Sequence, residues 1–216
     1  MSRHEVIAAI TAQRVVAIVR AREATVAAAT VRQLFRAGLR AVEVSLVTPD
    51  ALQVIEELAH DTPAGTYLGA GTVLNARQAR ECAGAGAAFL VAPTMRAEVI
   101  GAGHDHGLAV IPGACTPTEM VDAVDAGADL VKLFPATQWS VASVRDLRAS
   151  LPALPLVPTG GMTPETATDW LRAGCVAVGM GSALTAGPPD ELEARVGSLL
   201  SRLQAVAQAA DSGHRS

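Results

Sequence analysis

The amino-acid sequence predicts an α/β protein: a (β/α)8 barrel of the TIM type with an extra N-terminal helix. Three observations lead to this fold class. Short apolar runs alternate with amphipathic stretches along the whole chain of 216 residues. The runs are apolar almost without interruption, which is typical of parallel strands covered on both faces. Eight such runs are present, the number that closes a TIM barrel. A doubly wound open sheet is the main alternative.

The predicted elements follow one another in a regular order. A leading helix is expected over 2–12 and the last helix over 190–209. We expect a single domain over 1–216 with a disordered tail at 210–216. The eight predicted strands, each followed by a predicted helix, are 15–20, 41–46, 66–73, 88–93, 108–114, 130–136, 155–161 and 175–181.

Residues with strong positional preferences mark the ends of the predicted helices. In TPTE, Thr116 can cap a helix that starts at Pro117, and Glu119 can bond back to the cap. Thr-Pro pairs predict two more helix starts, within 48–50 and 163–165. Glycine is common directly after a helix, and it stands at the predicted ends at positions 38, 86, 127 and 174.

Composition and charge argue against several classes of function. The net charge is −4 and no basic cluster is present, so nucleic-acid binding has little support. The three cysteines form no CxxC pair and the five histidines no ligand pattern, which predicts a reduced protein without metal or cofactor. No apolar run reaches the roughly 20 residues of a membrane helix, and the N-terminus does not resemble a signal peptide. We expect a cytoplasmic protein that binds neither membranes nor nucleic acid.

Lys132, within DLVKLFPA, is the only lysine among 17 lysine and arginine residues. Arginine supplies surface charge and phosphate contacts, but it does not readily lose its proton. A lysine removed from water has a lowered pKa and can attack a carbonyl group to form a Schiff base. The structural alternatives are a lysine whose amine reaches solvent from a strand end, or chance in an arginine-rich sequence.

The alternation of side chains along a strand predicts where Lys132 points. Its two neighbours in the strand should face the helices, so Lys132 points into the barrel with Leu130 and Phe134. The same alternation in AVEVSL turns Glu43 inward. A buried structural ion pair is the alternative interpretation. We favour a functional pair, because ionisable groups with shifted pKa values in a barrel mouth are more often functional.

Polar residues and glycines follow several other strands, where the active sites of such barrels lie. Arg20 closes the first strand and can hold an anion, or it is a surface arginine. Thr72 lies among glycines that let a ligand approach the backbone, or it is an ordinary strand-end hydroxyl. Glycine-rich turns after the last two strands predict a phosphate cradle, formed by Thr159, Gly160, Gly161, Gly181 and Ser182.

Six motifs together resemble a known family: AVEVSL, GAGTVL, VAPTM, PGACTPTE, LVKLFPA and PTGGMTPE. The chain is similar to class I 2-keto-3-deoxy-6-phosphogluconate (KDPG) / 4-hydroxy-2-oxoglutarate (KHG) aldolases. The family includes the sister group that acts on 2-keto-3-deoxy-6-phosphogalactonate. The resemblance covers nearly the whole chain, from VVAIVRA to GMGSAL.

The resemblance implies a homotrimeric lyase of carbohydrate metabolism, of the Entner–Doudoroff type, that needs no metal. It implies that Lys132 forms the Schiff base and that Glu43 is the general acid and base. It also implies that Arg20, Thr72 and Pro93 line the substrate pocket and that Phe134 lies beside the lysine. The phosphate would be held by Gly160, Gly161, Gly181 and Ser182.

One position departs from the gluconate type. The resemblance to the gluconate type implies an arginine at position 47 that binds the pyruvate carboxylate, and this chain has Val47 there instead. The galactonate type also lacks this arginine, and Arg20 and Thr72 are the alternative holders. The expected reaction cleaves a 2-keto-3-deoxy-6-phospho sugar acid, gluconate or galactonate, to pyruvate and glyceraldehyde 3-phosphate. 4-Hydroxy-2-oxoglutarate, cleaved to pyruvate and glyoxylate, is a further candidate substrate.

Two other functions stay open at this point. The first is a different phosphate-binding TIM barrel, such as an isomerase or a phosphate-ester synthase, that uses no imine. The second is a barrel retained as a binding or assembly module. Such a module would be expected to have lost Lys132 or Glu43, and both are present.

Overall fold

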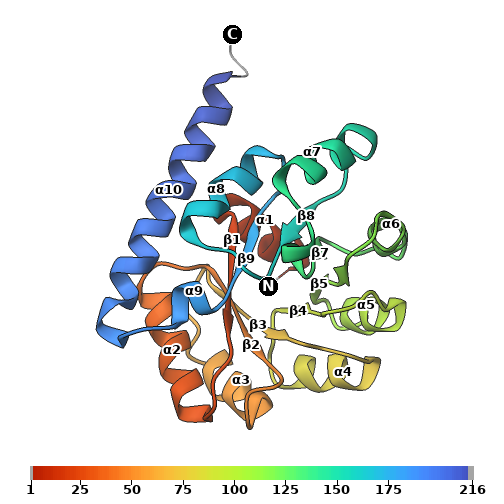
Figure 1. Ribbon diagram of the computed structural model, residues 1–216. Helices are drawn as coiled ribbons and strands as arrows, with labels where there is room; N and C mark the ends of the chain where they lie inside the picture. The colour runs from red at the N-terminus through yellow and green to blue at the C-terminus, as the bar shows by residue number, and fades with distance from the viewer. Residues whose placement is uncertain (1, 214–216) are drawn as a thin grey trace.

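The computed structural model describes residues 2–213 and shows a ring of parallel strands surrounded by helices (Figure 1). Six strands pair in the order β5-β4-β3-β2-β1-β9 and three in the order β6-β7-β8. The strands are β1 (Val15–Val19), β2 (Ala41–Ser45), β3 (Tyr67–Gly71), β4 (Phe89–Val91), β5 (Ala109–Ile111), β6 (Gly113–Ala114), β7 (Val131–Leu133), β8 (Leu156–Pro158) and β9 (Val178–Met180).

Backbone contacts close the two sheets into one barrel. Pro112 separates β5 from β6 at the fifth strand position, and its carbonyl accepts a hydrogen bond of 2.8 Å from the Lys132 N–H. On the other side, Thr159 forms a parallel bridge with Gly179 that joins β8 to β9. The closed ring confirms the predicted (β/α)8 barrel, and the doubly wound open sheet is excluded.

Helices follow the strands and cover the outside of the ring, as Figure 1 shows. Two short 3-10 turns, η1 (Ala136–Gln138) and η2 (Pro189–Glu191), precede α7 and α10. The helices are α1 (Arg3–Gln13), α2 (Ala24–Arg36), α3 (Ala51–Ala59), α4 (Ala76–Gly84), α5 (Ala97–His104), α6 (Pro117–Asp125), α7 (Val141–Ser150), α8 (Pro164–Arg172), α9 (Ser182–Thr185) and α10 (Leu192–Gly213).

Strand side chains divide into two hydrophobic clusters, in agreement with the predicted alternation. Val131 and Leu133 belong to the large cluster between the strands and the helices. Leu130 belongs to a smaller cluster inside the ring. Val6 and Ile10 of α1 join this inner cluster, so the extra helix covers the N-terminal end of the barrel and leaves the other end for a site.

The helix ends agree with the sequence signals at most positions. Thr116 and Glu119 form a reciprocal capping box at the start of α6, and Thr163 forms one with Thr166 at the start of α8. The glycines after the helices take the left-handed conformation that the chain reversal requires, with φ of 96° at Gly38, 89° at Gly86, 91° at Gly127 and 96° at Gly174.

The Thr-Pro pair within 48–50 does not start a helix, so this prediction was wrong. The helix α3 begins at Ala51, after Asp50, whose φ of 54° is left-handed. The Thr48 hydroxyl instead accepts a hydrogen bond of 3.3 Å from the Ala21 N–H of a neighbouring loop. A tertiary contact therefore replaces the local cap.

The last helix, α10, runs along one side of the barrel and extends past it (Figure 1). It includes residues 210–213 of the tail that the sequence predicted to be disordered, and 214–216 lie outside the described residues. No helix within 2–213 combines the length and hydropathy that a membrane span requires.

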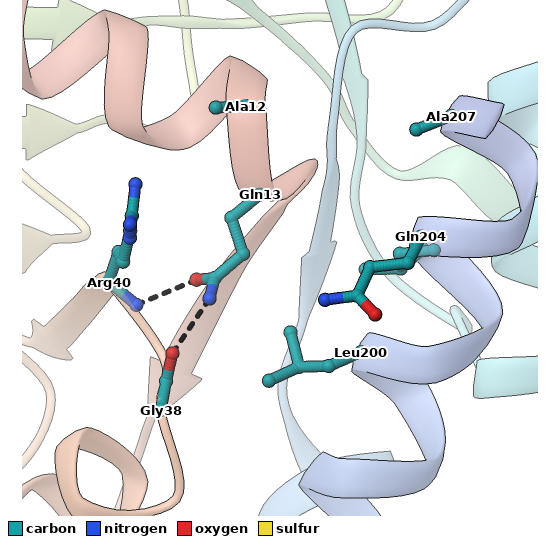
Figure 2. A pocket seen from close by; sticks show the side chains of 8 residues that line it. Ala12, Gln13, Gly38, Arg40, Leu200, Gln204 and Ala207 are labelled. Carbon is teal, nitrogen blue, oxygen red and sulfur yellow. Dashed lines mark hydrogen bonds between the residues drawn. The ribbon is translucent and has the colours of Figure 1, made fainter. Parts of the chain in front are cut away.

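A groove of about 360 Å³ lies between α10 and the loop that leads into β2. Gln13, at the end of α1, donates to the Gly38 carbonyl at 2.7 Å and accepts from the Arg40 N–H at 2.6 Å (Figure 2). Leu200 and Gln204 line the groove from α10. One side chain of α1 thus supplies two hydrogen bonds to the chain entering β2, the strand that carries Glu43.

Candidate active site

A cavity of about 510 Å³ opens at the carboxyl ends of the strands. This volume lies in the range of small-molecule sites, and this end of a TIM barrel carries the active site. Every residue that the sequence predicts for the site lines this one cavity: Arg20, Glu43, Thr72, Pro93, Lys132, Phe134, Thr159, Gly160, Gly161, Gly181 and Ser182.

Lys132 lies in the middle of β7 and points into the barrel, with 7% of the residue exposed. Its Nζ lies 4.7 Å from the centre of the Phe134 ring, within the range of a cation–π contact. Burial lowers the pKa of Lys132 below its ordinary value, and the positive charge of Arg20 adds to this effect. Glu43 acts in the opposite direction without reversing the shift.

Glu43 lies in the middle of β2, fully enclosed and facing the same cavity. Among the described residues, its Oε2 is a buried side-chain oxygen without a hydrogen-bond partner. Burial raises the pKa of Glu43 above its ordinary value, against the smaller opposing effects of Lys132 and Arg20. Gly71 makes room for this carboxylate, because a Cβ atom there would overlap it.

Burial therefore moves the pKa values of Lys132 and Glu43 towards each other. The amine loses its proton more easily than a solvated lysine, and the carboxyl keeps its proton more easily than a solvated glutamate. The apolar side chains of Val91, Ile111 and Val157, which surround the same interior space, account for the desolvation. Such a pair can supply a nucleophilic amine and a proton carrier in one cavity.

Thr72 follows β3 in a strained backbone conformation. Its φ of 64° is left-handed, which is a real outlier for a β-branched residue and costs on the order of 1–3 kcal/mol. Its Oγ1 lies 2.7 Å from the Oγ of Ser45, at the end of β2. Strain of this kind persists where the surroundings impose it, and it clusters at functional sites.

The glycine-rich turns after β8 and β9 bring bare backbone to the cavity. Gly160 and Gly161 have φ of 98° and 72°, a conformation that most side chains would disfavour. Among the described residues, none accepts a hydrogen bond from the N–H of Gly160, Gly161 or Ser182. These groups and the Ser182 hydroxyl are available to an anion in the cavity.

Thr159 directly follows β8 and lines the same interior space as Glu43 and Lys132. It is buried, and its hydroxyl donates to the Val157 carbonyl at 3.2 Å. Gly179 on the neighbouring strand leaves space for it, since a Cβ atom at that position would overlap the threonine side chain.

The sequence interpretation did not name four residues that line the cavity: Ile18, Met162, Gly179 and Thr185. Side-chain alternation could have predicted Ile18, because it lies on the same face of β1 as Val16, inside the barrel. Gly179 could also have been predicted, because a glycine within a strand often marks a place where another group approaches the backbone closely. Met162 lies in the loop before α8, and Thr185 ends the four-residue helix α9; both segments are too short for a periodic pattern to indicate direction.

Val47 is 57% exposed and does not line the cavity. Within the part of the chain that the structure describes, no three histidine, cysteine or acidic side chains gather as metal ligands.

Known proteins are similar to this chain in sequence and in fold. A family model described as "Aldolase: KDPG and KHG aldolase" matches residues 6–193. The chain is 35% identical over 170 residues to the 2-dehydro-3-deoxy-6-phosphogalactonate aldolase of Escherichia coli K12, covering 78% of this chain and 83% of that protein. It is 36% identical over 182 residues to the 2-dehydro-3-deoxy-phosphogluconate aldolase of Pseudoalteromonas atlantica, covering 83% of each.

A solved structure adds a chemical state. It is the KDPG aldolase from Legionella pneumophila, with pyruvate captured as a covalent carbinolamine intermediate. It superimposes with a TM-score of 0.77 at 26% identity and covers 93% of this chain and 97% of that one. The sequence match and the shared fold both extend along most of the chain, which belongs to the KDPG and KHG aldolase family.

Proposed function

We propose that this protein is a Schiff-base aldolase that cleaves a 2-keto-3-deoxy-6-phospho sugar acid, gluconate or galactonate, to pyruvate and glyceraldehyde 3-phosphate. One observation carries the proposal. The only lysine of the chain lies buried in the cavity with a lowered pKa, and the unpartnered carboxylate of Glu43 lines the same space. The carbinolamine trapped in the Legionella pneumophila relative supports this chemistry.

The reaction begins at the neutral amine of Lys132. Nζ attacks the C2 ketone, and loss of water from the carbinolamine, with uptake of one proton from solvent that the final hydrolysis returns, leaves a protonated imine. Glu43, acting through a water molecule, takes the C4 hydroxyl proton as the C3–C4 bond breaks. The electron pair of that bond moves to C3 and the imine, which gives an enamine and a free aldehyde. Glu43 returns the proton to C3, and water releases pyruvate and regenerates the amine.

The rest of the cavity fits the two anionic ends of such a substrate. Arg20 and Thr72 are proposed to hold the keto-acid carboxylate, since Val47 is exposed and apolar. The free N–H groups of the two glycine turns are proposed to hold the phosphate of the aldehyde half. Neither role requires a metal ion.

Trapping the imine tests the proposal directly. The folded protein is incubated with pyruvate, reduced with borohydride and digested, and the peptides are examined by mass spectrometry. We expect a pyruvate adduct on the peptide that contains Lys132, because the other primary amine is the chain's α-amino group. Lys132→Arg keeps the charge and is expected to lose both the adduct and turnover. No adduct on the wild-type peptide would favour another phosphate-binding barrel enzyme that uses no imine.

The sugar acid is settled by a substrate panel. KDPG and its galactonate counterpart differ in configuration at C4, and the two aldolases compared above, one named for each sugar acid, are nearly equally identical to this chain. Release of pyruvate from each epimer, and from 4-hydroxy-2-oxoglutarate, is measured under identical conditions. The epimer with the higher kcat/KM is the substrate, with 4-hydroxy-2-oxoglutarate as the unphosphorylated comparison.

We also propose that the protein forms a homotrimer in the cytoplasm and acts in a pathway of the Entner–Doudoroff type. Two exposed apolar side chains support an oligomer. Val47 is 57% and Leu74 45% exposed, and they follow the paired strands β2 and β3. Sedimentation should give three times the mass of the chain, and Val47→Asp with Leu74→Asp should lower it.

A further inference from the structure

Ser45 is a buried hydroxyl at the end of β2 that the proposed reaction does not use. The residue is fully buried, and it follows Glu43 by two positions on the same face of the strand. A serine without access to water needs a hydrogen-bond partner, because an unpartnered buried hydroxyl is costly.

Within residues 2–213, the Ser45 side chain has one hydrogen-bond partner, the Oγ1 of Thr72 at 2.7 Å. Geometry alone allows either hydroxyl to be the donor. The surroundings distinguish the two hydroxyls. The hydroxyl hydrogen of Ser45 has Thr72 Oγ1 as its one acceptor, whereas the half-buried Thr72 lines the cavity, where its own hydrogen can meet a ligand. Ser45 therefore donates and Thr72 accepts.

The backbone holds Thr72 in place for this contact. On one side of it, the Leu46 N–H donates to the Gly71 carbonyl at 2.8 Å, and on the other the Val73 N–H donates to the Val91 carbonyl at 3.1 Å. These bonds keep Thr72 at its left-handed φ. With its oxygen occupied by Ser45, the threonine hydroxyl has its own hydrogen left for an acceptor in the cavity.

We propose that Ser45 is a positioning residue for keto-acid binding. It orients the Thr72 hydroxyl so that its hydrogen is presented to the carboxylate of the keto acid. The inference rests on the proposed function, in which pyruvate occupies the cavity beside Lys132. It explains why a buried polar residue lies two positions beyond the proposed acid/base carboxylate.

The test measures the pyruvate concentration that half-saturates borohydride trapping on Lys132. Ser45→Ala should raise this concentration about fivefold and leave the trapped fraction at saturating pyruvate unchanged. Thr72→Val, which keeps the shape and removes the hydroxyl, should raise it about tenfold. Thr72→Ser retains the donor and should stay closer to the wild type than Thr72→Val. Ser201→Ala, on an exposed face of α10, is the matched control and should change nothing.

The double variant separates positioning from a general structural effect. If Ser45 acts through Thr72, then Ser45→Ala adds no further increase in the Thr72→Val background. Additive effects of the two substitutions would overturn the proposal, and so would a Thr72→Val variant that binds pyruvate like the wild type. If Ser45→Ala does not fold, Ser45→Cys, a weaker donor of similar size, should give an intermediate value, and a wild-type value would overturn the proposal. Failure of the proposed function is distinguishable, because the wild type itself would then trap no pyruvate.

Discussion

Asp129, at the N-terminal end of β7, should be a strong determinant of stability although it lies at the opposite end of the barrel from the cavity. Its side chain is 10% exposed, and Oδ1 pairs with Arg3 Nε of the capping helix at 3.0 Å. Oδ2 accepts from the buried Val110 N–H at 2.8 Å and lies 3.1 Å from His104 Nε2. One carboxylate thus connects α1, β5 and α5 to the start of β7.

The cost of Asp129→Ala follows from these contacts. The Val110 N–H would lose its acceptor while buried, which costs about 1–3 kcal/mol. The partly exposed pair with Arg3 contributes about 0.2–1 kcal/mol. A loss near 2.5 kcal/mol is therefore expected, which lowers Tm by about 5–10 °C for a chain of this length.

Thermal unfolding followed by circular dichroism is the assay. Asp169→Ala is the matched control, because the Asp169–Arg172 pair is exposed on both sides and should change the stability by less than about 0.5 kcal/mol. The turnover of Asp129→Ala at 25 °C should stay within about twofold of the wild type, since this face of a barrel serves stability. If the two variants had the same Tm, the assigned network would carry no stability and the reasoning would be refuted.

Two other predictions concern the cavity and the groove. Imine formation needs the neutral amine of Lys132, whose pKa is raised by Glu43 and lowered by Arg20. At saturating pyruvate, the pH at which borohydride trapping reaches half of its maximum should therefore be lower in Glu43→Gln and higher in Arg20→Gln than in the wild type. An unchanged midpoint pH in both variants would contradict this electrostatic account. Gln13→Ala removes the two Gln13 hydrogen bonds to the chain before β2 and should lower the free energy of unfolding by about 1–3 kcal/mol in a urea titration, whereas Gln204→Ala across the groove should lower it by less than about 0.5 kcal/mol. Equal urea midpoints for the two glutamine variants would argue against a stabilising role of the two Gln13 hydrogen bonds.

The sequence determined much of this fold because its signals are local. Side-chain alternation with a period of two placed Leu130 and Lys132 inside the ring, in agreement with the structure. The cap at Thr116 needs only residues three apart, so it could be recognised without a structure. The Thr-Pro signal at 48–50 failed because the Thr48 hydroxyl has a partner 27 residues away, which no local pattern reports.

The sequence by itself determined which side chains of the site could do chemistry, and ring closure decided how they act. The single lysine is evident from the residue types, and the inward direction of Glu43 follows from the alternation of side chains along its strand. The directions of their pKa shifts depend on burial by side chains from other strands, such as Val91 and Val157. The contact between Ser45 and Thr72 likewise exists only because β2 and β3 pair in one register and the backbone of Thr72 turns left-handed. Desolvation and hydrogen bonding between strands depend on which residues lie close together in space, and those residues become neighbours only when the chain folds.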